Sequence, residues 1–217
     1  MIEPHSTPTS PMLRPLRLGD IAPDFQARTT FGDIRLSDYR GRWLVFFSHP
    51  ADFTPVCTSE FVAIAKAADA FAARDCALLA LSVDSLHAHF AWVHAIRQAF
   101  GITIGFPIVE DPSMVVGRSY GMIDEQSHDS AAMRATYFID PDGVIRAMTC
   151  YPLNVGRSVD EMLRMVAALQ RTAGEDVLAP EGWRPGDDLL AAPPQHQDTV
   201  LSGTGEHWFY QPKPEPK

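Results

Sequence analysis

Short apolar runs alternate with segments of helical periodicity along most of the chain. Residues 43–48 form a continuous run rich in aromatic and aliphatic side chains, and residues 77–83 form a second apolar run. Runs of this kind are typical of strands that are buried on both faces of a sheet. Residues 57–72 and 85–100 instead carry apolar side chains at helical spacing, which predicts two amphipathic helices. Gly101 follows the second helix in the position where glycine commonly ends one.

The remaining pattern contains two antiparallel pairs and a closing helix. Turn-forming residues at 29–33 separate two short alternating stretches, and Pro141-Asp142-Gly143 separates two more, so each marks a β-hairpin. The other expected elements are a strand at 107–109, a short helix at 113–120, hairpin strands at 135–139 and 143–149, and a helix at 158–172. The order β-α-β-α-β-β-α predicts an α/β fold, a thioredoxin-like sandwich with a mixed sheet flanked by helices.

Proline-rich segments at both ends divide the chain into three parts. Residues 1–16 are polar and rich in proline, which predicts a flexible N-terminal arm. Residues 17–173 contain the α/β pattern and form the expected core domain. Residues 174–217 carry proline too often for long helices. We expect this C-terminal extension to pack against a surface at a subunit interface, because it holds large aromatic side chains: Trp183, Trp208, Phe209 and Tyr210.

Composition and charge argue against several classes of partner. With 18 Lys and Arg against 27 Asp and Glu, the formal net charge is −9, so nucleic acid and anionic membrane surfaces would repel the protein. No apolar run approaches the roughly 20 residues that a membrane-spanning helix needs. The start of the chain also lacks the apolar stretch of a secretory signal peptide. The sequence therefore predicts a cytoplasmic protein without nucleic-acid or membrane partners.

The cysteines do not form a disulfide framework. There are three of them, Cys57, Cys76 and Cys150, and no C-x-x-C motif for zinc binding or dithiol chemistry. Each is therefore either a small buried hydrophobe or a working thiol. Cys76 opens a predicted buried strand, so we expect it in the core.

Three histidines in the predicted helix 85–100 raise the question of a metal site. His87 and His94 share one helix face, whereas His89 points elsewhere, and no nearby cysteine completes a ligand set. We interpret the three histidines as part of a solvated helix face, and we predict no metal and no organic cofactor.

Reactive chemistry is indicated most strongly at residues 49–60, H-P-A-D-F-T-P-V-C-T-S-E, where the first buried strand ends and a helix begins. Such a strand end is the usual place for an active site in an open α/β sheet. Cys57 falls in the first helical turn, where unpaired N–H groups and the helix dipole stabilise a thiolate. Thr54 would bring a hydroxyl to the sulfur, and Pro50 would cover the pocket with apolar surface.

A structural interpretation of the same segment stays open at this point. Thr54 and Cys57 can begin a helix without any catalytic role, with Thr58 or Ser59 as its cap. The pair T-x-x-C is too short to decide between the two interpretations by itself.

The longer segment resembles the peroxiredoxin signature P-x-x-x-T-x-x-C, which Pro50, Thr54 and Cys57 match. Its fuller form is similar to that of the 1-Cys branch, the peroxiredoxin-6 subfamily. The resemblance extends over residues 17–215 through segments in matching order: A-L-S-V-D-S at 80–85, R-A-T-Y-F-I-D at 134–140, Y-P-L-N-V-G-R at 151–157 and W-R-P-G-D at 183–187. It implies a thiol-dependent peroxidase that reduces hydrogen peroxide and organic hydroperoxides in antioxidant defence and redox homeostasis.

The resemblance also implies roles for individual residues. Cys57 matches the peroxidatic cysteine, which becomes a sulfenic acid when it reduces the peroxide. Arg134 matches the arginine that holds the thiolate and orients the peroxide, a task that suits its fixed fork of donors. Thr54 and Pro50 match the other catalytic positions.

Three further positions match residues that support this site. Glu60 and Arg157 match a pair that positions Arg134. His49 matches a histidine beside the pocket in the 1-Cys branch, and a purely structural, hydrogen-bonded histidine is an equal alternative.

The cysteine count decides how the sulfenic acid is expected to be reduced. No cysteine follows Cys150, so the C-terminal resolving cysteine of two-cysteine relatives is missing. We expect an external thiol, namely glutathione, glutaredoxin or thioredoxin, to recycle Cys57. The alternatives are a two-cysteine cycle that uses Cys150, and an oligomeric chaperone or holdase role. The resemblance further implies a homodimer or a larger ring.

Overall fold

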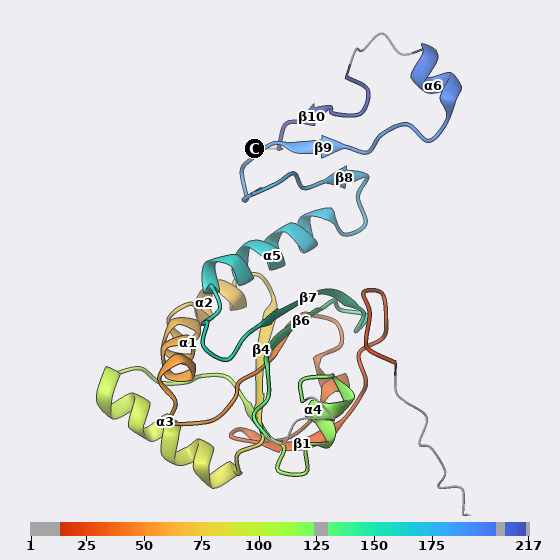
Figure 1. The fold of residues 1–217 in the computed structure, drawn as a ribbon. Helices are drawn as coiled ribbons and strands as arrows, with labels where there is room; N and C mark the ends of the chain where they lie inside the picture. The colour runs from red at the N-terminus through yellow and green to blue at the C-terminus, as the bar shows by residue number, and fades with distance from the viewer. Residues whose placement is uncertain (1–13, 124–129, 203–206, 216–217) are drawn as a thin grey trace, which may run out of the picture.

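The computed structural model describes residues 14–123, 130–202 and 207–215, and its central element is a mixed seven-stranded sheet (Figure 1). The strand order is β2-β1-β5-β4-β3-β6-β7. The strands are β1 (Gln26–Thr29), β2 (Gly32–Arg35), β3 (Trp43–Ser48), β4 (Cys76–Ser82), β5 (Ile108–Glu110), β6 (Arg134–Ile139) and β7 (Ile145–Tyr151).

The central strands are parallel and the outer strands are antiparallel. β3 pairs with β4, and β4 pairs with β5, both in parallel. The predicted hairpins lie at the two edges of the sheet, with β1 and β2 at one edge and β6 and β7 at the other. Gly143 sits in the turn of the second hairpin with φ 72°, a left-handed conformation that glycine adopts without strain. This mixed sheet confirms the predicted thioredoxin-like α/β class.

Helices cover both faces of the sheet. One face is covered by α1 (Pro55–Lys66), α2 (Ala68–Ala72), α3 (Leu86–Phe100) and α5 (Val159–Thr172). The other face is covered by the 3-10 helix η1 (Leu36–Tyr39) and by α4 (Val115–Ser119).

Two of the long helices begin one residue later than the sequence pattern predicts. Ser85 and Ser158 are their N-cap residues, and each serine oxygen accepts a hydrogen bond from the backbone N–H three residues further on. The caps satisfy N–H groups that have no partner inside the helix. Serine therefore fixes the start of both α3 and α5.

Neighbouring residues of β3 contribute to two separate hydrophobic cores. Val45 and Phe47 face the side covered by α1, α3 and α5, whereas Leu44 and Phe46 face the side covered by η1 and α4. Burying one such side chain stabilises the fold by about 1.5–3 kcal/mol. Burial on both faces is the reason why this strand shows no alternation of apolar and polar residues.

The interpretation of His89 as part of a solvated helix face is wrong. His89 is 0% exposed, whereas His87 and His94 lie on the exposed side of α3. His89 shares the buried stripe of the helix with Trp92 and Ile96, which follow it three and seven residues later. Its imidazole can be buried because it has a hydrogen-bonding partner that is distant in the sequence, as described below.

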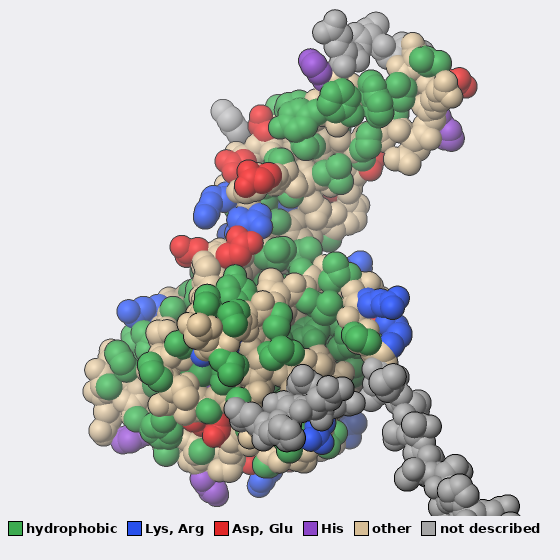
Figure 2. All heavy atoms as spheres, in the orientation of Figure 1, with side chains coloured by type: hydrophobic (Ala, Val, Ile, Leu, Met, Phe, Trp, Pro, Cys, Tyr) green, Lys and Arg blue, Asp and Glu red, His purple; other side chains and the backbone are tan. Residues whose placement is uncertain are grey.

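The C-terminal extension leaves the core domain beyond α5 and forms a small sheet of its own (Figure 1). Trp183 is 2% exposed and packs with Ala167 and Ala168 of α5, which fixes the base of the extension. Trp208, Phe209 and Tyr210 are between 39% and 63% exposed, and Figure 2 shows apolar side chains gathered on this part of the surface. The location at a subunit interface stays a prediction. The elements of the extension are β8 (Val177–Leu178), β9 (Leu189–Ala191), α6 (Gln197–Ser202) and β10 (Pro212–Lys213).

The predicted N-terminal arm, 1–16, falls largely outside the described residues. Of its described part, Arg14 forms a 2.7 Å ion pair with Asp20, and Leu16 packs against the core on the η1 side. Within the three described ranges, no helix has both the length and the apolar character to cross a lipid bilayer.

Candidate active site

A sharp turn leads the chain from β3 into α1. Phe53 adopts φ 58°, a left-handed conformation that is strained for a bulky residue. Thr54 follows as the N-cap with extended backbone angles, and Pro55 takes the first helical position, where its fixed φ suits the helix and its missing N–H is not needed. Cys57 is thereby placed in the first turn of α1, beside N–H groups that have no helical partner.

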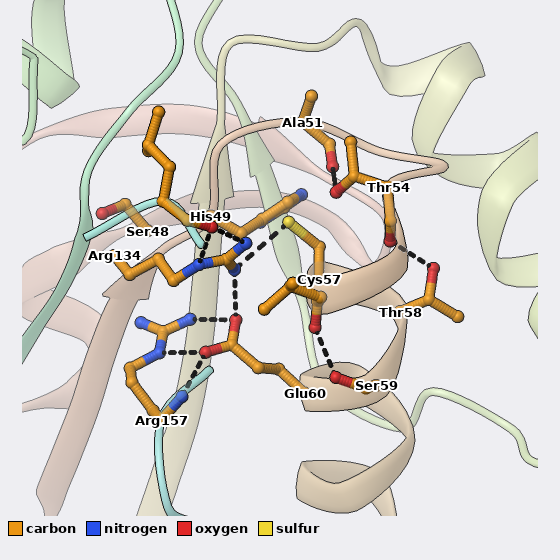
Figure 3. A network of polar contacts seen from close by, with 12 residues as sticks. Ser48, His49, Ala51, Thr54, Cys57, Thr58, Ser59, Glu60, Arg134 and Arg157 are labelled. Carbon is orange, nitrogen blue, oxygen red and sulfur yellow. Dashed lines mark hydrogen bonds and ion pairs between the residues drawn. The ribbon is translucent and has the colours of Figure 1, made fainter. Parts of the chain in front are cut away.

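The sulfur of Cys57 is buried and faces a guanidinium group. Cys57 is a free cysteine with 0% exposure, and its Sγ accepts a hydrogen bond from Nη1 of Arg134 at 3.4 Å (Figure 3). Arg134 is the first residue of β6, so this contact joins the sheet to the start of α1. The permanent charge of Arg134 and the N-terminus of α1 both place positive potential at this sulfur.

The guanidinium of Arg134 is held from two sides. Its Nε and Nη2 donate to the carbonyl oxygen of Leu153 at 3.0 and 2.8 Å. Its Nη1 donates to Oε2 of Glu60 at 2.7 Å, in addition to the sulfur of Cys57. Arginine can make all these contacts at once because its donors form a planar fork, which the single ammonium of lysine lacks.

Glu60 is held in turn by Arg157. Oε1 of Glu60 accepts from the backbone N–H and from Nε of Arg157 at 2.8 and 2.9 Å, and Oε2 accepts from Nη2 at 2.9 Å. Burial by itself would raise the pKa of Glu60, but the hydrogen bonds and charge of Arg157, with the charge of Arg134, hold this pKa below its ordinary value. Glu60 is therefore an ionised carboxylate that fixes both arginines.

The charges of Arg134, Glu60 and Arg157 do not cancel one another. Arg134 and Arg157 contribute +2 and Glu60 contributes −1, and the three side chains are each only 2% exposed. The remainder, +1, lies in a site where an uncompensated charge is costly. One negative charge on the sulfur of Cys57 would bring this sum to zero.

Thr54 and Pro50 border the site without a hydrogen bond to the sulfur. The hydroxyl of Thr54 donates to the carbonyl oxygen of Ala51 at 2.9 Å, so its hydrogen is engaged away from Cys57 (Figure 3). Pro50 is buried directly after His49, at the end of β3.

The suggested caps of α1 are wrong. Thr58 and Ser59 donate their hydroxyls to the carbonyl oxygens of Thr54 and Val56 at 2.8 and 2.7 Å. Both therefore lie inside the helix, and Thr54 stands at the N-cap.

Sequence reasoning missed a buried carboxylate next to the site. Asp52 lies between His49 and His89: its Oδ1 is 2.9 Å from Nε2 of His49, and its Oδ2 is 2.7 Å from Nδ1 of His89. Asp52 is the one charged residue in the segment 50–56, which was the available signal for it. His89 had no comparable local signal.

The other two cysteines have different surroundings. Cys76 is buried at the start of β4, and burial raises the pKa of its thiol to about 12, so it stays a protonated core residue as predicted. Cys150 is exposed on β7 opposite Ala135, which belongs to the core on the η1 and α4 side. Cys57 belongs to the core on the other face of the sheet. The sheet therefore separates Cys150 from Cys57.

An open groove of about 790 Å³ runs along the outer side of α1. It borders the turn that carries Cys57, and its lining is mostly apolar with one cation, Lys66. Among the lining residues are Phe53, Thr54, Pro55, Thr58, Val62 and Phe100.

The fold and the site together define a thiol-based redox protein: a cysteine in the first turn of a helix on a thioredoxin-like sheet, held by a buried arginine. Comparison with known protein families agrees with this class. The AhpC/TSA family model matches residues 18–148, and the model for the C-terminal domain of 1-Cys peroxiredoxin matches residues 168–203.

Individual relatives are similar over most of their length. The chain is 46% identical to peroxiredoxin 2 of Caldanaerobacter subterraneus over 179 residues, which cover 82% of this chain and 81% of the relative. It is 49% identical to a peroxiredoxin of Aquifex aeolicus over 170 residues, or 78% and 77% of the two chains.

Solved structures show the same likeness. A yeast mitochondrial 1-Cys peroxiredoxin, described with thiol resolution through the glutathione/thioredoxin systems, superposes with a TM-score of 0.79 at 36% identity and covers 91% of this chain and 98% of its own. A Cys-to-Ser mutant of peroxiredoxin 6 of Arenicola marina superposes with a TM-score of 0.82 at 31% identity. The match covers 93% of this chain and 99% of the mutant's chain. The chain belongs to the peroxiredoxin family of thiol-dependent peroxidases, with the C-terminal domain of its 1-Cys members.

Proposed function

We propose that Cys57 is the peroxidatic residue of this peroxidase and that Arg134, Thr54 and Pro50 complete its catalytic site. The thiolate of Cys57 attacks the terminal oxygen of a hydroperoxide, so that an S–O bond forms while the O–O bond breaks. Cys57 becomes a sulfenic acid, and the leaving alkoxide or hydroxide takes a proton from solvent and departs as alcohol or water. Sulfur is oxidised and the peroxide is reduced, with no further redox partner in this step.

The observation that carries the proposal is the charge of the buried set around Cys57. Glu60 compensates only one of the two guanidinium groups, which leaves a positive charge that a thiolate neutralises. The same Nη1 of Arg134 that reaches the sulfur is fixed by Glu60, so it needs no reorganisation when negative charge develops on the leaving oxygen.

Both small and large hydroperoxides suit the surroundings of the site. The groove beside the first turn of α1 has a mainly apolar lining, which can take the organic part of an alkyl hydroperoxide. Hydrogen peroxide needs no such lining. We therefore propose hydrogen peroxide and alkyl hydroperoxides as the substrates, with antioxidant defence and redox homeostasis in the cytoplasm as the role.

Recycling of Cys57 is proposed to depend on an external thiol. The thiol attacks the sulfenic sulfur and releases water, and a second thiol reduces the resulting mixed disulfide. Cys76 is buried with a raised pKa, and Cys150 faces the other side of the sheet, so neither supports an internal disulfide with Cys57. The similarity to a yeast 1-Cys enzyme described with glutathione and thioredoxin systems supports glutathione, glutaredoxin or thioredoxin as the reductant.

The assembly is proposed to be a homodimer, alone or within a larger ring. β7 forms an edge of the seven-stranded sheet, and an unpaired edge strand of seven residues readily pairs with another strand. The exposed aromatic side chains of the C-terminal extension, Trp208, Phe209 and Tyr210, offer a second contact surface.

Stopped-flow measurement of peroxide consumption tests the proposed role of Cys57. The pre-reduced protein should consume one equivalent of hydrogen peroxide rapidly. This phase should vanish in Cys57→Ser and survive in the matched variants Cys76→Ser and Cys150→Ser. A reaction of equal rate in Cys57→Ser would refute the proposal.

A further inference from the structure

Two histidines share one buried carboxylate behind the first turn of α1. Oδ1 of Asp52 is 2.9 Å from Nε2 of His49, and Oδ2 is 2.7 Å from Nδ1 of His89. Both imidazoles are 0% exposed, and Asp52 is 7% exposed. His49 and Asp52 belong to the loop after β3, whereas His89 lies on α3, so the carboxylate joins two elements that are distant in the sequence.

The chemistry of the carboxylate fixes the protons on both rings. Burial would raise the pKa of Asp52, but the hydrogen bonds with the two histidines outweigh this and hold the pKa below its ordinary value. An ionised carboxylate can only accept hydrogen bonds. Nε2 of His49 and Nδ1 of His89 must therefore carry hydrogen and donate to Asp52.

For His49, burial decides whether the other ring nitrogen also carries a proton. Burial lowers the pKa of His49, which favours the neutral imidazole with a single N–H. Nδ1 of His49 and Nε2 of His89 are buried and have no hydrogen-bond partner among the described residues. A second proton on either ring would add an N–H with no acceptor. The arrangement thus selects one tautomer of His49, with hydrogen on Nε2 and a bare Nδ1.

Aromatic contacts couple His49 to the helix that carries Cys57. The ring of His49 meets Phe61 edge-on with centroids 4.7 Å apart, and it stacks on Trp92 at 5.2 Å. Phe61 lies one helical turn after Cys57 on the buried face of α1. Nε1 of Trp92 donates to Oγ1 of Thr58 at 3.2 Å, and Thr58 directly follows Cys57 in α1.

Figure 3 shows that His49 extends from the end of β3 into the site formed by Cys57 and Arg134. A change in the orientation of this ring is therefore passed to α1 through Phe61 and through Trp92, which bonds Thr58. Within the described part of the chain, His89 has no hydrogen bond to Cys57 or Arg134; it pairs with Asp52 at 2.7 Å, and its ring lies near that of His49, with centroids 6.2 Å apart. We therefore expect its influence on the site to pass through Asp52 and His49.

We propose that Asp52 and His89 are positioning residues of the peroxidase site, which act by holding the ring of His49 in one orientation and one tautomer. The inference rests on the proposed role of Cys57 and deepens it. Hydrogen-bonding partners that orient metal-ligating histidines typically contribute roughly 10- to 100-fold to metal affinity or activity, and we expect an effect of the same order for an oriented histidine beside a reactive thiol. The same loss is expected when His89 no longer donates to Asp52, although His89 lies outside the catalytic contacts.

Substitutions at His89 separate this role from simple packing. His89→Leu removes the donor and should slow peroxide oxidation of Cys57 roughly 10- to 100-fold. His89→Asn places an amide N–H near the position of Nδ1 and should restore most of the rate that His89→Leu loses, because the amide can again donate to Asp52. The matched control is His87→Leu, an exposed histidine on the same helix, which should leave the rate unchanged.

A double-mutant cycle tests whether His89 acts through His49. In a His49→Leu background, His89→Leu should cause no further loss of rate, because interacting residues are not additive. Nitrogen-15 NMR of the imidazoles gives a readout independent of catalysis: His49 should show the tautomer with hydrogen on Nε2 in the wild type, and should lose this preference in Asp52→Leu, which removes the carboxylate that accepts that hydrogen. Should His89→Leu fail to fold, Asp52→Asn serves instead, since it keeps the shape but forces one histidine to change its proton.

Several results would overturn the inference. These are an unchanged rate in His89→Leu, equal losses in His89→Leu and His89→Asn, additive losses with His49→Leu, or the opposite tautomer of His49. Tight binding of one Zn²⁺ per chain that is lost in His89→Leu would also contradict it, because the three side chains would then be metal ligands. Failure of the proposed function is distinguishable, since the wild type would then lack the Cys57-dependent peroxide phase while the tautomer of His49 stayed as described.

Discussion

Nη1 of Arg134 donates to Sγ of Cys57 at 3.4 Å, although the two residues are 77 positions apart in the chain. The contact joins the first residue of β6 to the first turn of α1, and Glu60 fixes it from one turn further along the helix. If Cys57 is the peroxidatic residue as we propose, its reactivity is expected to depend on how accurately the sheet and the helix are held together.

Replacing Arg134 by lysine tests this dependence. Lysine keeps the positive charge, but its single nitrogen cannot reproduce the contacts that Arg134 makes from three nitrogens to Leu153, Glu60 and the sulfur. We expect the second-order rate of Cys57 oxidation to fall on the order of 100- to 1,000-fold, as when one preorganised donor is removed from an active site. Ultraviolet absorbance of the thiolate should also fall at neutral pH.

The control for this substitution is Arg97→Lys, which changes an exposed arginine on α3. It should leave both the rate and the thiolate absorbance as in the wild type. An Arg134→Lys variant that reacts as fast as this control would remove Arg134 from the catalytic site.

Replacing Glu60 by glutamine should destabilise the fold. The change leaves two buried guanidinium groups without their carboxylate, and breaking a buried ion pair in this way costs about 3–5 kcal/mol. Denaturant unfolding at neutral pH measures this difference in the free energy of unfolding. Glu161→Gln, which removes a more exposed carboxylate paired with Arg164, is the matched control and should cost about 1 kcal/mol or less.

The pH dependence of the free energy of unfolding, compared between the wild type and Glu60→Gln, gives a second test. The pKa of Glu60 is lowered in the folded state, so its contribution to stability is fully present above the pKa of an unfolded glutamate, about 4.3. It is lost as the pH falls through the lower, folded pKa. The gap in stability between wild type and Glu60→Gln should therefore narrow in acid, and a constant gap would contradict the ionised state of Glu60.

The exposed aromatic side chains of the C-terminal extension allow a test of the proposed dimer. Changing Trp208, Phe209 and Tyr210 together to serine should convert the dimer to a monomer, because the lost contact area is apolar and exposed in the single chain. Light scattering after size-exclusion chromatography gives the mass. Phe31→Ser, at another residue that is 61% exposed, is the control and should stay dimeric. A triple variant that remains a dimer would show that the extension is not the contact.

Most of the fold could be predicted because its signals are local. The run 43–48 is β3. The pattern at 85–100 is α3, which begins one residue later than predicted, with Ser85 as its N-cap. The small sheet of the extension was not predicted, since β8 and β10 have only two residues each and carry no periodicity. Short strands of this kind depend on the packing of Trp183 against α5 rather than on their own sequence.

The site could be predicted only in part, because only some of its residues lie in one local motif. Cys57 and Thr54 stand in one local motif, whereas Arg134 and Glu60 were expected from the family resemblance and not from their spacing. The pairing of Asp52 with His89 spans 37 residues and was missed. A histidine on an amphipathic helix gives no sign of a carboxylate that only the folded chain brings to it.

Intact-mass analysis after one equivalent of hydrogen peroxide tests the central claim most directly. The reduced protein should gain one oxygen atom, located on the peptide that contains Cys57, and a thiol such as glutathione should remove it again. Loss of two hydrogens, which indicates an internal disulfide, or an oxygen found on Cys76 or Cys150, would contradict the account.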